Sequence, residues 1–371
     1  MTRPPDEVVL ITGFPRLGAR KLMELTLESD PDTHVSMVVL PKVVEQACEA
    51  LVNLPKSARS RVEILEGDAA AMDLGLSGHE FRQLASRVTL IHHLAHASYV
   101  GVEREAAEYT NVHGAIEMVE LGRACERLRC LVHHSTAHVS GDRSGLVYED
   151  ELDCGQGFHS PVQESRMKAE KVMRRAMPDL PISVVRPTML VGDSITGEAD
   201  RFDGPYLLVM LLLGMPGDMP VPLPTGTDNP LDIVPVDYVT RAAHAIGRHP
   251  EAPGLTVHLT SSEELTARTV FDLIAEAGGR RTRKSVIPTQ IASVIMRTPG
   301  LERFVKEPRA FLQQLASPSR YDTRNARRLL AGTGIECPPL ASYVDTWVTA
   351  VKEHLRRRRD DRIDVEVPPV G

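Results

Sequence analysis

The sequence has few of the features that define several large classes of protein. Its five cysteines in 371 residues are mostly far apart and odd in number, so we expect reduced thiols in a cytoplasmic protein, not a disulfide framework. The formal net charge of −7 argues against a nucleic-acid partner. No internal repeat or low-complexity tract occurs. What remains is an ordinary globular chain, long enough for one large domain or two unequal ones.

Long hydrophobic runs are also missing. The first residues, MTRPPDEVVLITG, hold too short an apolar stretch for the core of a signal peptide. The most apolar run is YLLVMLLLGM at residues 206–215, and ten helical residues cannot cross a hydrocarbon layer of about 30 Å. We therefore expect no membrane span. Two interpretations of the run stay open, core packing or a channel for an apolar ligand, which would be lined by Leu207, Leu208, Met210, Leu211 and Met215.

Short β-branched runs alternate with longer segments of helical period through the first half of the chain. The runs lie at residues 7–12, 34–40, 61–67, 88–95, 128–136 and 182–192, and helices are expected near 17–29, 42–53, 79–86, 103–126 and 161–177. This alternation predicts an α/β fold, a doubly wound parallel sheet covered by helices on both faces.

The composition changes after residue 195. Residues 196–230 are rich in proline, and residues 261–350 are expected to form mostly helices. We predict a nucleotide-binding domain over 1–195, to which 231–260 returns, and a smaller, mostly helical C-terminal substrate lobe over 196–230 and 261–350. Residues 351–371 form a charged tail. The ligand cleft is expected at the carboxyl ends of the strands, beside the lobe.

Six short motifs follow one another at the ends of the predicted elements. In chain order they are TGFPRLG (12–18), GDAAAMDL (67–74), HHLAHASY (92–99), NVHGA (111–115), HSTAHVSGD (134–142) and VVRPTMLVGDS (184–194). Together they resemble the extended short-chain dehydrogenase/reductase superfamily, closest to its fatty-acyl and thioester reductases and its NAD-dependent epimerase/dehydratase-like members. The resemblance covers roughly residues 7–260 and implies a Rossmann fold with NADP or NAD as cofactor.

The resemblance also assigns a nucleotide site, in which the first turn is altered. The turn TGFPRLG is one residue shorter than the family pattern TGxxGxxG, and Pro15, which has no N–H, stands with Arg16 in place of the middle glycine. We expect Arg16 or Arg20 to contact phosphate instead, the alternative being a turn that binds nothing. The residues assigned to the cofactor are Thr12, Gly13, Arg16, Leu17, Gly18, Lys42, Asp68, Ala95 and Pro187.

Two of these residues bear on the adenosine end of the cofactor. No acid follows the second strand, and Lys42 at this point favours NADP over NAD, unless it is only a solvated lysine. Asp68 resembles the aspartate on the adenine side in this family, and its alternative role is to cap the turn after the third strand.

The reactive residues of the resembled family are altered as well. That family uses a serine or threonine, with a tyrosine and a lysine one helical turn apart. Thr136 stands at the first position, but in SPVQESRMKAE (160–170) Val162 stands at the tyrosine and Arg166 at the lysine. No tyrosine lies between Tyr148 and Tyr206, so a shift of register does not restore the pair. Val162 cannot donate a proton, whereas Arg166 can keep a charge and hydrogen bonds to a ribose.

Histidine is concentrated in the middle of the sequence, where eight of the fourteen lie between His92 and His159. His96, His138 and His159 fall at strand ends or in loops, and His138 and His159 are the candidates to replace the missing acid. A structural or surface role is the alternative for each. The spacing brings no three ligands together, so we expect no metal site.

Two functions follow as hypotheses. The first is an NAD(P)-binding oxidoreductase-like protein that acts on a hydrophobic carbonyl, acyl or hydroxy compound, with Thr136 holding the substrate oxygen and Arg166 the ribose. The second is a non-catalytic relative, which serves as a nucleotide or ligand sensor or as a partner protein. Proton transfer without hydride exchange is a third class and requires a pair of histidines. A homodimer is the assembly we consider.

Overall fold

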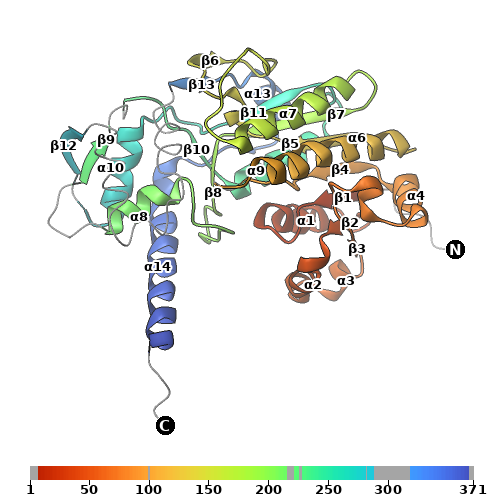
Figure 1. The fold of residues 1–371 in the computed structure, drawn as a ribbon, viewed down its shortest axis with the longest axis horizontal. Helices are drawn as coiled ribbons and strands as arrows, with labels where there is room; N and C mark the ends of the chain where they lie inside the picture. The colour runs from red at the N-terminus through yellow and green to blue at the C-terminus, as the bar shows by residue number, and fades with distance from the viewer. Residues whose placement is uncertain are drawn as a thin grey trace, which may run out of the picture. The chain divides into compact units, whose positions relative to one another are not determined.

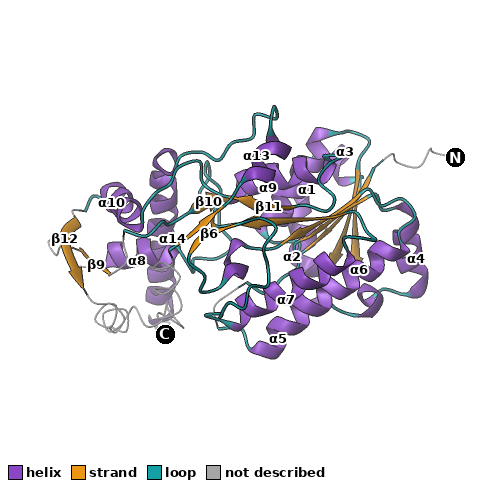
Figure 2. Cartoon of the chain, turned by 90° about the horizontal axis from the view of Figure 1, so that it is seen from above, coloured by secondary structure: helices purple, strands orange, loops and turns teal. Residues whose placement is uncertain are grey.

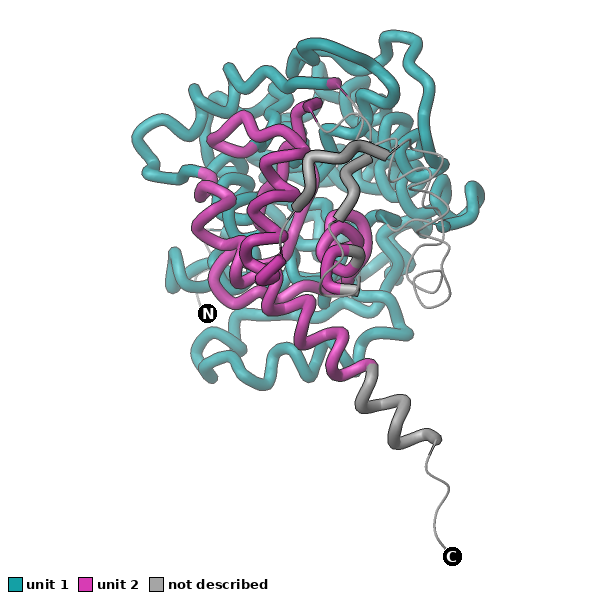
Figure 3. Tube along the Cα trace, turned by 90° about the vertical axis from the view of Figure 1, so that its left-hand side faces the viewer, with its two compact units in different colours: residues 1–188, 236–260, 319–336 teal, residues 189–235, 261–318, 337–371 magenta. Residues whose placement is uncertain are grey.

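The computed structural model describes residues 7–98, 101–214, 221–224, 228–280, 282–287 and 318–366. The chain divides into two compact units, which Figure 3 shows in different colours. Unit 1 comprises Met1–Thr188, Val236–Thr260 and Ser319–Glu336, and unit 2 comprises Met189–Pro235, Ser261–Pro318 and Cys337–Gly371. The chain therefore passes between the units several times.

Unit 1 contains a seven-stranded sheet in the order β11-β7-β5-β4-β1-β2-β3 (Figure 1). Every pair of neighbouring strands is parallel. The predicted doubly wound parallel sheet is thus confirmed. The strands are β1 (Val8–Thr12), β2 (His34–Val39), β3 (Val62–Glu66), β4 (Leu90–His93), β5 (Cys130–His134), β7 (Ile182–Pro187) and β11 (Thr256–Leu259).

Helices cover both faces of this sheet (Figure 2). α1 packs against α9, and α6 packs against α7. The two pairs lie on opposite faces, because Gly114 of α6 lies beside His93 and Gly247 of α9 lies beside His92, and adjacent strand residues point to opposite sides. The double cover explains why β1 is buried along its whole length. The helices are α1 (Leu17–Ser29), α2 (Val44–Val52), α3 (Lys56–Arg59), α4 (Gly78–Arg87), α5 (Arg104–Glu108), α6 (Gly114–Ala124), α7 (Pro161–Ala176), α9 (Val236–Arg248) and α13 (Arg324–Leu330).

The helix expected near residues 103–126 is interrupted. Between α5 and α6 the residues Tyr109–His113 form a π-helical turn, a feature that inserts an extra residue and often occurs at functional sites. The same unit contains a short parallel pair of β6 (Gly145–Val147) and β13 (Ser319–Tyr321). This pair joins the segment 319–336 to the first part of the chain.

The chain reverses its direction of travel across the sheet between β1 and β4. From β1 it proceeds to β2 and β3 on one side, and from β4 to β5, β7 and β11 on the other. Ligands of open α/β sheets bind outside the carboxyl ends of the strands at such a switch point. Thr12 and His93 are the last residues of the two central strands. They mark where a ligand is expected.

The strand expected over residues 182–192 is two strands, which belong to different units. β7 ends at Pro187, and the N–H of Thr188 still bonds to the carbonyl of Leu259 at 3.1 Å. The N–H of Met189 bonds instead to the carbonyl of Asp232 at 3.2 Å. The strand divides because its hydrogen-bond partner changes at this point. β8 (Met189–Val191) then pairs with β10 (Ile233–Pro235) in a separate sheet of two strands.

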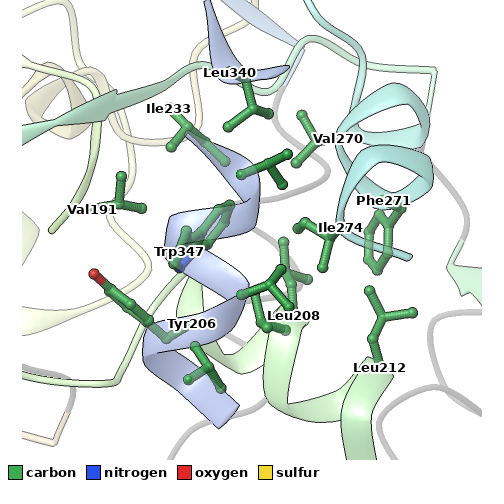
Figure 4. Packing of buried hydrophobic residues seen from close by; sticks show 14 of the residues in the cluster. Val191, Tyr206, Leu208, Leu212, Ile233, Val270, Phe271, Ile274, Leu340 and Trp347 are labelled. Atoms are coloured by element: carbon green, nitrogen blue, oxygen red, sulfur yellow. The ribbon is translucent and has the colours of Figure 1, made fainter. Parts of the chain in front are cut away.

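Unit 2 has a core of aliphatic and aromatic side chains contributed by α8, α10 and α14 (Figure 4). α8 is apolar on all sides, and its Leu207, Leu208 and Met210 are buried in a cluster with Phe271 and Trp347. This packing accounts for the apolar run and favours a core over a ligand channel. Met215 and the side chain of Leu211 lie outside the described residues. The other elements are α8 (Tyr206–Gly214), α10 (Ala267–Ala277), α14 (Val344–Glu366), β9 (Val221–Pro224) and β12 (Thr282–Ile287).

The length and apolar character of a helix decide whether it can span a membrane. Among the residues that the structure describes, none forms a helix that is long and apolar enough to cross a bilayer. The run at 206–215 contributes to a helix of nine residues, α8.

Candidate functional site

The carboxyl ends of β1 and β4 are joined through the side chain of Thr12. Its Oγ1 accepts hydrogen bonds from the backbone N–H groups of Leu94 and Ala95, each at 3.0 Å. With both acceptor positions used, the hydroxyl proton is directed at Nδ1 of His93, 3.0 Å away, which assigns the imidazole proton to Nε2. Thr12 and Ala95, both predicted at the nucleotide site, therefore hold the two strand ends together.

Gly13 begins the turn that follows β1. Its φ is +85°, and a Cβ at this position would lie 2.8 Å from the carbonyl carbon and oxygen of Leu94. Glycine is required because of both the backbone conformation and the close approach. At Gly18 a Cβ would make ordinary contacts, the nearest with Cδ2 of Leu94 at 3.6 Å. Of the two predicted glycines, Gly13 is the one that the geometry demands.

The N-terminus of α1 is suited to an anion. The helix begins at the buried Leu17, with no side-chain cap and no acid in its first turn. Such a helix end carries a partial positive charge. Nη1 of Arg16 donates to the carbonyl of His96 at 2.7 Å, and Nε of Arg20 donates to the carbonyl of Pro15 at 3.2 Å. Both arginines that the sequence suggested for phosphate thus lie beside this turn.

The residues predicted on the adenosine side lie after β2 and β3. Lys42 is exposed in a short turn, Pro41–Val43, that follows β2. Asp68 follows β3, where its Oδ1 accepts from the N–H of Ala70 at 2.9 Å and its Oδ2 from the hydroxyl of Tyr109 at 3.3 Å. The first of these bonds is the turn cap that the sequence left open as the alternative role of Asp68. Tyr109 is an additional side chain at this position.

Asn111, in the π-helical turn, ties three elements together and was not among the predicted site residues. Its side-chain amide accepts from the N–H of Ala97 at 2.8 Å and donates to the carbonyl of the same residue at 3.2 Å. It also donates to Oγ of Ser165 on α7 at 2.8 Å. The loop after β4 is thereby fixed to the helix that bears Val162 and Arg166. The sequence signal was the motif NVHGA, which Asn111 begins.

Val162 lies in the first turn of α7. Its half-buried side chain packs against an apolar cluster of Ala97, Val102 and Ala107. The helix is fixed at this end by Ser160, whose Oγ accepts from the N–H of Gln163 at 3.3 Å. The side chain that we predicted to stand at the family's tyrosine is therefore engaged in a packing contact.

Arg166 lies one turn further along α7 and is 5% exposed. Nη2 donates to the carbonyl of His134 at 2.8 Å. Nε and Nη1 are buried and have no hydrogen-bond partner in the part of the chain that the structure describes. Burial lowers the pKa of Arg166 to about 10, with the charge of Glu170 opposing the shift and that of Arg16 adding to it. Arg166 is therefore a buried cation with two unused donors.

Glu170, one turn beyond Arg166, is committed to other partners. Its carboxylate accepts from Nη2 of Arg186 at 2.6 Å, from Nε of Arg174 at 2.8 Å and from Oγ of Ser135 at 2.7 Å. Burial raises the pKa of Glu170, but the Arg186 guanidinium and these hydrogen bonds outweigh it and lower the pKa to about 2. Glu170 thus stays ionised and joins α7 to β5 and β7.

Histidines surround Arg166. Burial is the main cause that lowers the pKa of five of them, and the charge of Arg166 contributes in each case. The values fall to about 3 for His93 and His134 and about 4 for His138, so these imidazoles are neutral at pH 7. Both ring nitrogens of His133 and Nδ1 of His96 have no hydrogen-bond partner among the described residues. The five are His93, His96, His133, His134 and His138.

The pairs of adjacent histidines in β4 and β5 contact each other across the two strands. The two strands pair in register, with His93 opposite His133. Their rings stack with centroids 5.5 Å apart, and on the other face Nδ1 of His92 lies 3.2 Å from Nε2 of His134. The sequence signal was a pair of adjacent histidines at the end of two neighbouring parallel strands.

The remaining predicted reaction residues follow β5 or precede α7. Oγ1 of Thr136 accepts from the N–H of His138 at 3.3 Å and donates to the carbonyl of Pro187 at 3.5 Å. The charge of Arg166 and then that of His159 contribute to the lowered pKa of His138, so these groups share one region. A neutral imidazole of pKa about 4 is a poor proton donor near pH 7.

A metal centre was not expected at this site. Within the described ranges, no three histidine, cysteine, aspartate or glutamate side chains are placed to hold a metal ion.

The parallel sheet and the glycine turn after β1 define a Rossmann protein built like the extended short-chain dehydrogenases. The chain belongs to the NAD-binding family described as male sterility protein, whose model matches residues 12–243. The predicted resemblance to the fatty-acyl and thioester reductase branch is confirmed by the relatives.

Two curated relatives and one solved structure illustrate the similarity. The chain is 26% identical over 322 residues to the nonribosomal peptide synthetase asaC of Aspergillus flavus, covering 78% of this chain and 30% of that protein. It is 26% identical over 282 residues to the fatty acyl-CoA reductase wat of Drosophila melanogaster, covering 64% and 53%. The crystal structure of the terminal R domain from the myxalamid PKS-NRPS pathway matches with a TM-score of 0.82 at 25% identity, covering 95% of this chain and 92% of that one.

The lengths of these proteins differ. The chain spans 30% and 53% of the two curated relatives, and almost all of the R domain. The similarity is therefore to one domain of larger proteins.

Proposed function

We propose that unit 1 binds an NAD(P) dinucleotide, and that the chain has lost the proton donor that the family reaction requires. One observation carries this proposal: Val162 packs against Ala97, Val102 and Ala107, while Nε and Nη1 of Arg166, at the lysine position, have no hydrogen-bond partner among the described residues. A bound nicotinamide exchanges hydride, but the substrate oxygen also needs a proton. Weak or absent reduction follows, together with retained nucleotide binding.

Three features of the switch point support the dinucleotide. The backbone at Gly13 approaches β4 closely, the N-terminus of α1 has no side-chain cap, and Arg16 lies beside both. One unused N–H group of Arg166 suits a ribose hydroxyl. Lys42, exposed after β2, suits a 2′-phosphate, so NADP is the preferred form.

The second ligand is a hydrophobic carbonyl, acyl or hydroxy compound, by analogy with the fatty acyl-CoA reductase among the relatives. Thr136 would hold its oxygen. Without the tyrosine, the chain serves as a sensor of nucleotide and ligand or as a partner protein. A reductase that uses histidine as its acid is the second candidate, favoured by the position of His138 beside Thr136.

Binding of the nucleotide is tested by titrating the purified chain with NADPH, NADH and their oxidised forms. We expect Arg16→Ala to weaken binding about tenfold, the size of one charge-assisted hydrogen bond. Arg20→Ala is the matched control and should have a smaller effect, since Nε of Arg20 already bonds to Pro15. If the wild-type chain binds none of the four forms, the proposal is wrong.

The loss of the acid is tested by restoring it. Val162→Tyr with Arg166→Lys recreates the tyrosine–lysine pair, and general acid catalysis is typically worth about 10²–10⁴-fold. We expect carbonyl or thioester reduction only in the double variant. Activity in the wild type that disappears in His138→Ala or His159→Ala would move the chemistry to histidine. Robust turnover with both histidines replaced would contradict both accounts.

A further inference from the structure

Arg166 carries a positive charge, and among the described residues no acid forms a hydrogen bond with it. The bond that the structure shows from its Nη2 goes to a neutral carbonyl, that of His134. Nε and Nη1 have no hydrogen-bond partner among the described residues. An unpaired buried charge costs several kcal/mol unless a partner of opposite charge compensates it.

The described surroundings compensate this charge only in part, because the nearby Glu170 also serves other cations. Glu170 is shared among Arg186, Arg174 and Ser135. Arg16 adds a second positive charge, because it contributes to the lowered pKa of Arg166. The histidines around Arg166 are neutral at pH 7. The potential at the end of β5 is therefore positive.

A ribose hydroxyl cannot remedy this imbalance. It can accept one hydrogen bond from Arg166, but it brings no negative charge. A carboxylate or phosphate oxygen accepts the hydrogen bond and balances the charge, and bonds of this kind are about twice as strong as neutral ones.

We propose that a ligand of this site presents an oxyanion, a carboxylate or phosphate group, to Nε or Nη1 of Arg166. The inference rests on the proposed function, since the oxyanion would lie beside the bound dinucleotide. It deepens that function by changing the second ligand from a neutral carbonyl compound to an acid. A hydrophobic carboxylic acid is the simplest compound that satisfies both Arg166 and the family resemblance.

The oxyanion reaches Arg166 only after a neighbour moves, because Nε and Nη1 are covered in the structure. His96 and His138 are half-buried and lie near enough to Arg166 for its charge to lower their pKa. A side chain that covers these two nitrogens must therefore move when the ligand enters.

The test is calorimetric titration of the full chain, with and without NADPH, using octanoate, octanamide and inorganic phosphate. Octanamide has nearly the shape of octanoate without its charge. We expect octanoate to bind and octanamide to bind at least tenfold more weakly. Octanoate binding to the NADPH complex indicates a separate acid as the ligand, whereas phosphate binding that NADPH abolishes indicates the phosphates of the nucleotide.

Variants of α7 decide whether Arg166 is responsible. Arg166→Gln should weaken octanoate binding about 10- to 100-fold, while Arg166→Lys, which keeps the charge, should lose less. Lys168→Gln is the matched control on the same helix, because it removes a surface cation paired with Glu108 and Glu164, and should change nothing. Circular dichroism and thermal unfolding confirm that each variant is folded.

The outcomes separate this inference from the proposed function. Equal affinity for octanamide, or full affinity in a folded Arg166→Gln variant, overturns the inference. So does NADPH binding with no binding of either anion, although the proposed function then stands. Octanoate binding through Arg166 in a chain that binds no dinucleotide supports the inference and overturns the nucleotide proposal.

Discussion

Unit 1 and unit 2 bury different kinds of side chain. The core of unit 1 includes the charged groups Arg166, Glu170 and Arg186, each at most 5% exposed, together with the histidines of β4 and β5. The described core of unit 2 is a cluster of aliphatic and aromatic residues such as Leu208 and Trp347 (Figure 4). The core of unit 1 therefore adds directional bonds between specific partners to its apolar packing, whereas the described core of unit 2 depends on shape and volume.

The two cores therefore differ in which substitutions they tolerate. A buried ion pair or hydrogen-bond network contributes little net stability, but removing one member leaves an uncompensated group and costs several kcal/mol. An apolar core tolerates exchanges that conserve volume. Isosteric substitutions in the two units should therefore differ more in their loss of unfolding free energy than truncations do.

The largest effect is expected for Glu170→Gln in unit 1. The substitution keeps the shape of the side chain but leaves the buried Arg186 without its counter-charge, and the free energy of unfolding should fall by about 3–5 kcal/mol. Urea denaturation measures the change. Glu164→Gln, on the exposed face of the same helix, is the control and should cost less than about 1 kcal/mol. Equal losses of unfolding free energy in the two variants would show that the buried Glu170 network stabilises the protein no more than the ion pair of Glu164 does.

The next effect is the response of unit 1 to acid. Burial and neighbouring charges lower the pKa of His134 from 6.5 to about 3, so below pH 6.5 the unfolded chain binds a proton that the folded chain does not. Stability must then fall as the pH drops from 6.5 towards 3, by about 1.4 kcal/mol per pH unit for such a histidine.

The measurement is the free energy of unfolding at several pH values in wild type and in His134→Leu. The variant should lose less stability on acidification. His79→Gln, which replaces an exposed histidine, should follow the wild type. A wild-type profile that is flat between pH 6.5 and 4 would falsify the assignment of neutral buried histidines.

The smallest effect is expected for Leu208→Met in unit 2. Methionine has nearly the volume of leucine and adapts its shape, so the cost should stay below about 1.5 kcal/mol, against about 2–5 kcal/mol for Leu208→Ala. Both are measured by denaturation of the full chain. If Leu208→Met cost as much as Leu208→Ala, the core of unit 2 would tolerate a change of side-chain shape as poorly as the core of unit 1.

The sequence predicted the central sheet because its signals are local. Continuous apolar runs such as β1 follow directly from burial on both faces, and helical periods mark the covering helices. The break between β7 and β8 could not be predicted in this way. It depends on which strand offers the next carbonyl, Leu259 or Asp232, and both are distant in the sequence.

The candidate site was predictable in position but not in its contacts. Motif order placed Thr12 and Thr136 at the carboxyl ends of two strands of the sheet and Arg166 on the helix before β7. The hydrogen bonds between Glu170 of α7 and Arg186 of β7 depend on how side chains from distant segments meet. The same holds for the hydrogen bond from Asn111, in the π-helical turn, to Ser165 of α7. The apolar run of α8 allowed two interpretations, because burial among helices and the lining of a channel require the same residues.

The interrupted path of the chain has a consequence for its synthesis. β11 pairs with β7, and the carboxylate of Glu149 accepts hydrogen bonds from the N–H groups of His258 and Asn325. Unit 1 cannot be finished until these later segments have left the ribosome. At about 5–20 residues per second, β11 follows β7 by roughly 4–14 seconds, during which the edge of β7 that faces away from β5 is unpaired. The nascent chain is therefore most exposed to mispairing while the first segment of unit 2, Met189–Pro235, and α9 are being made.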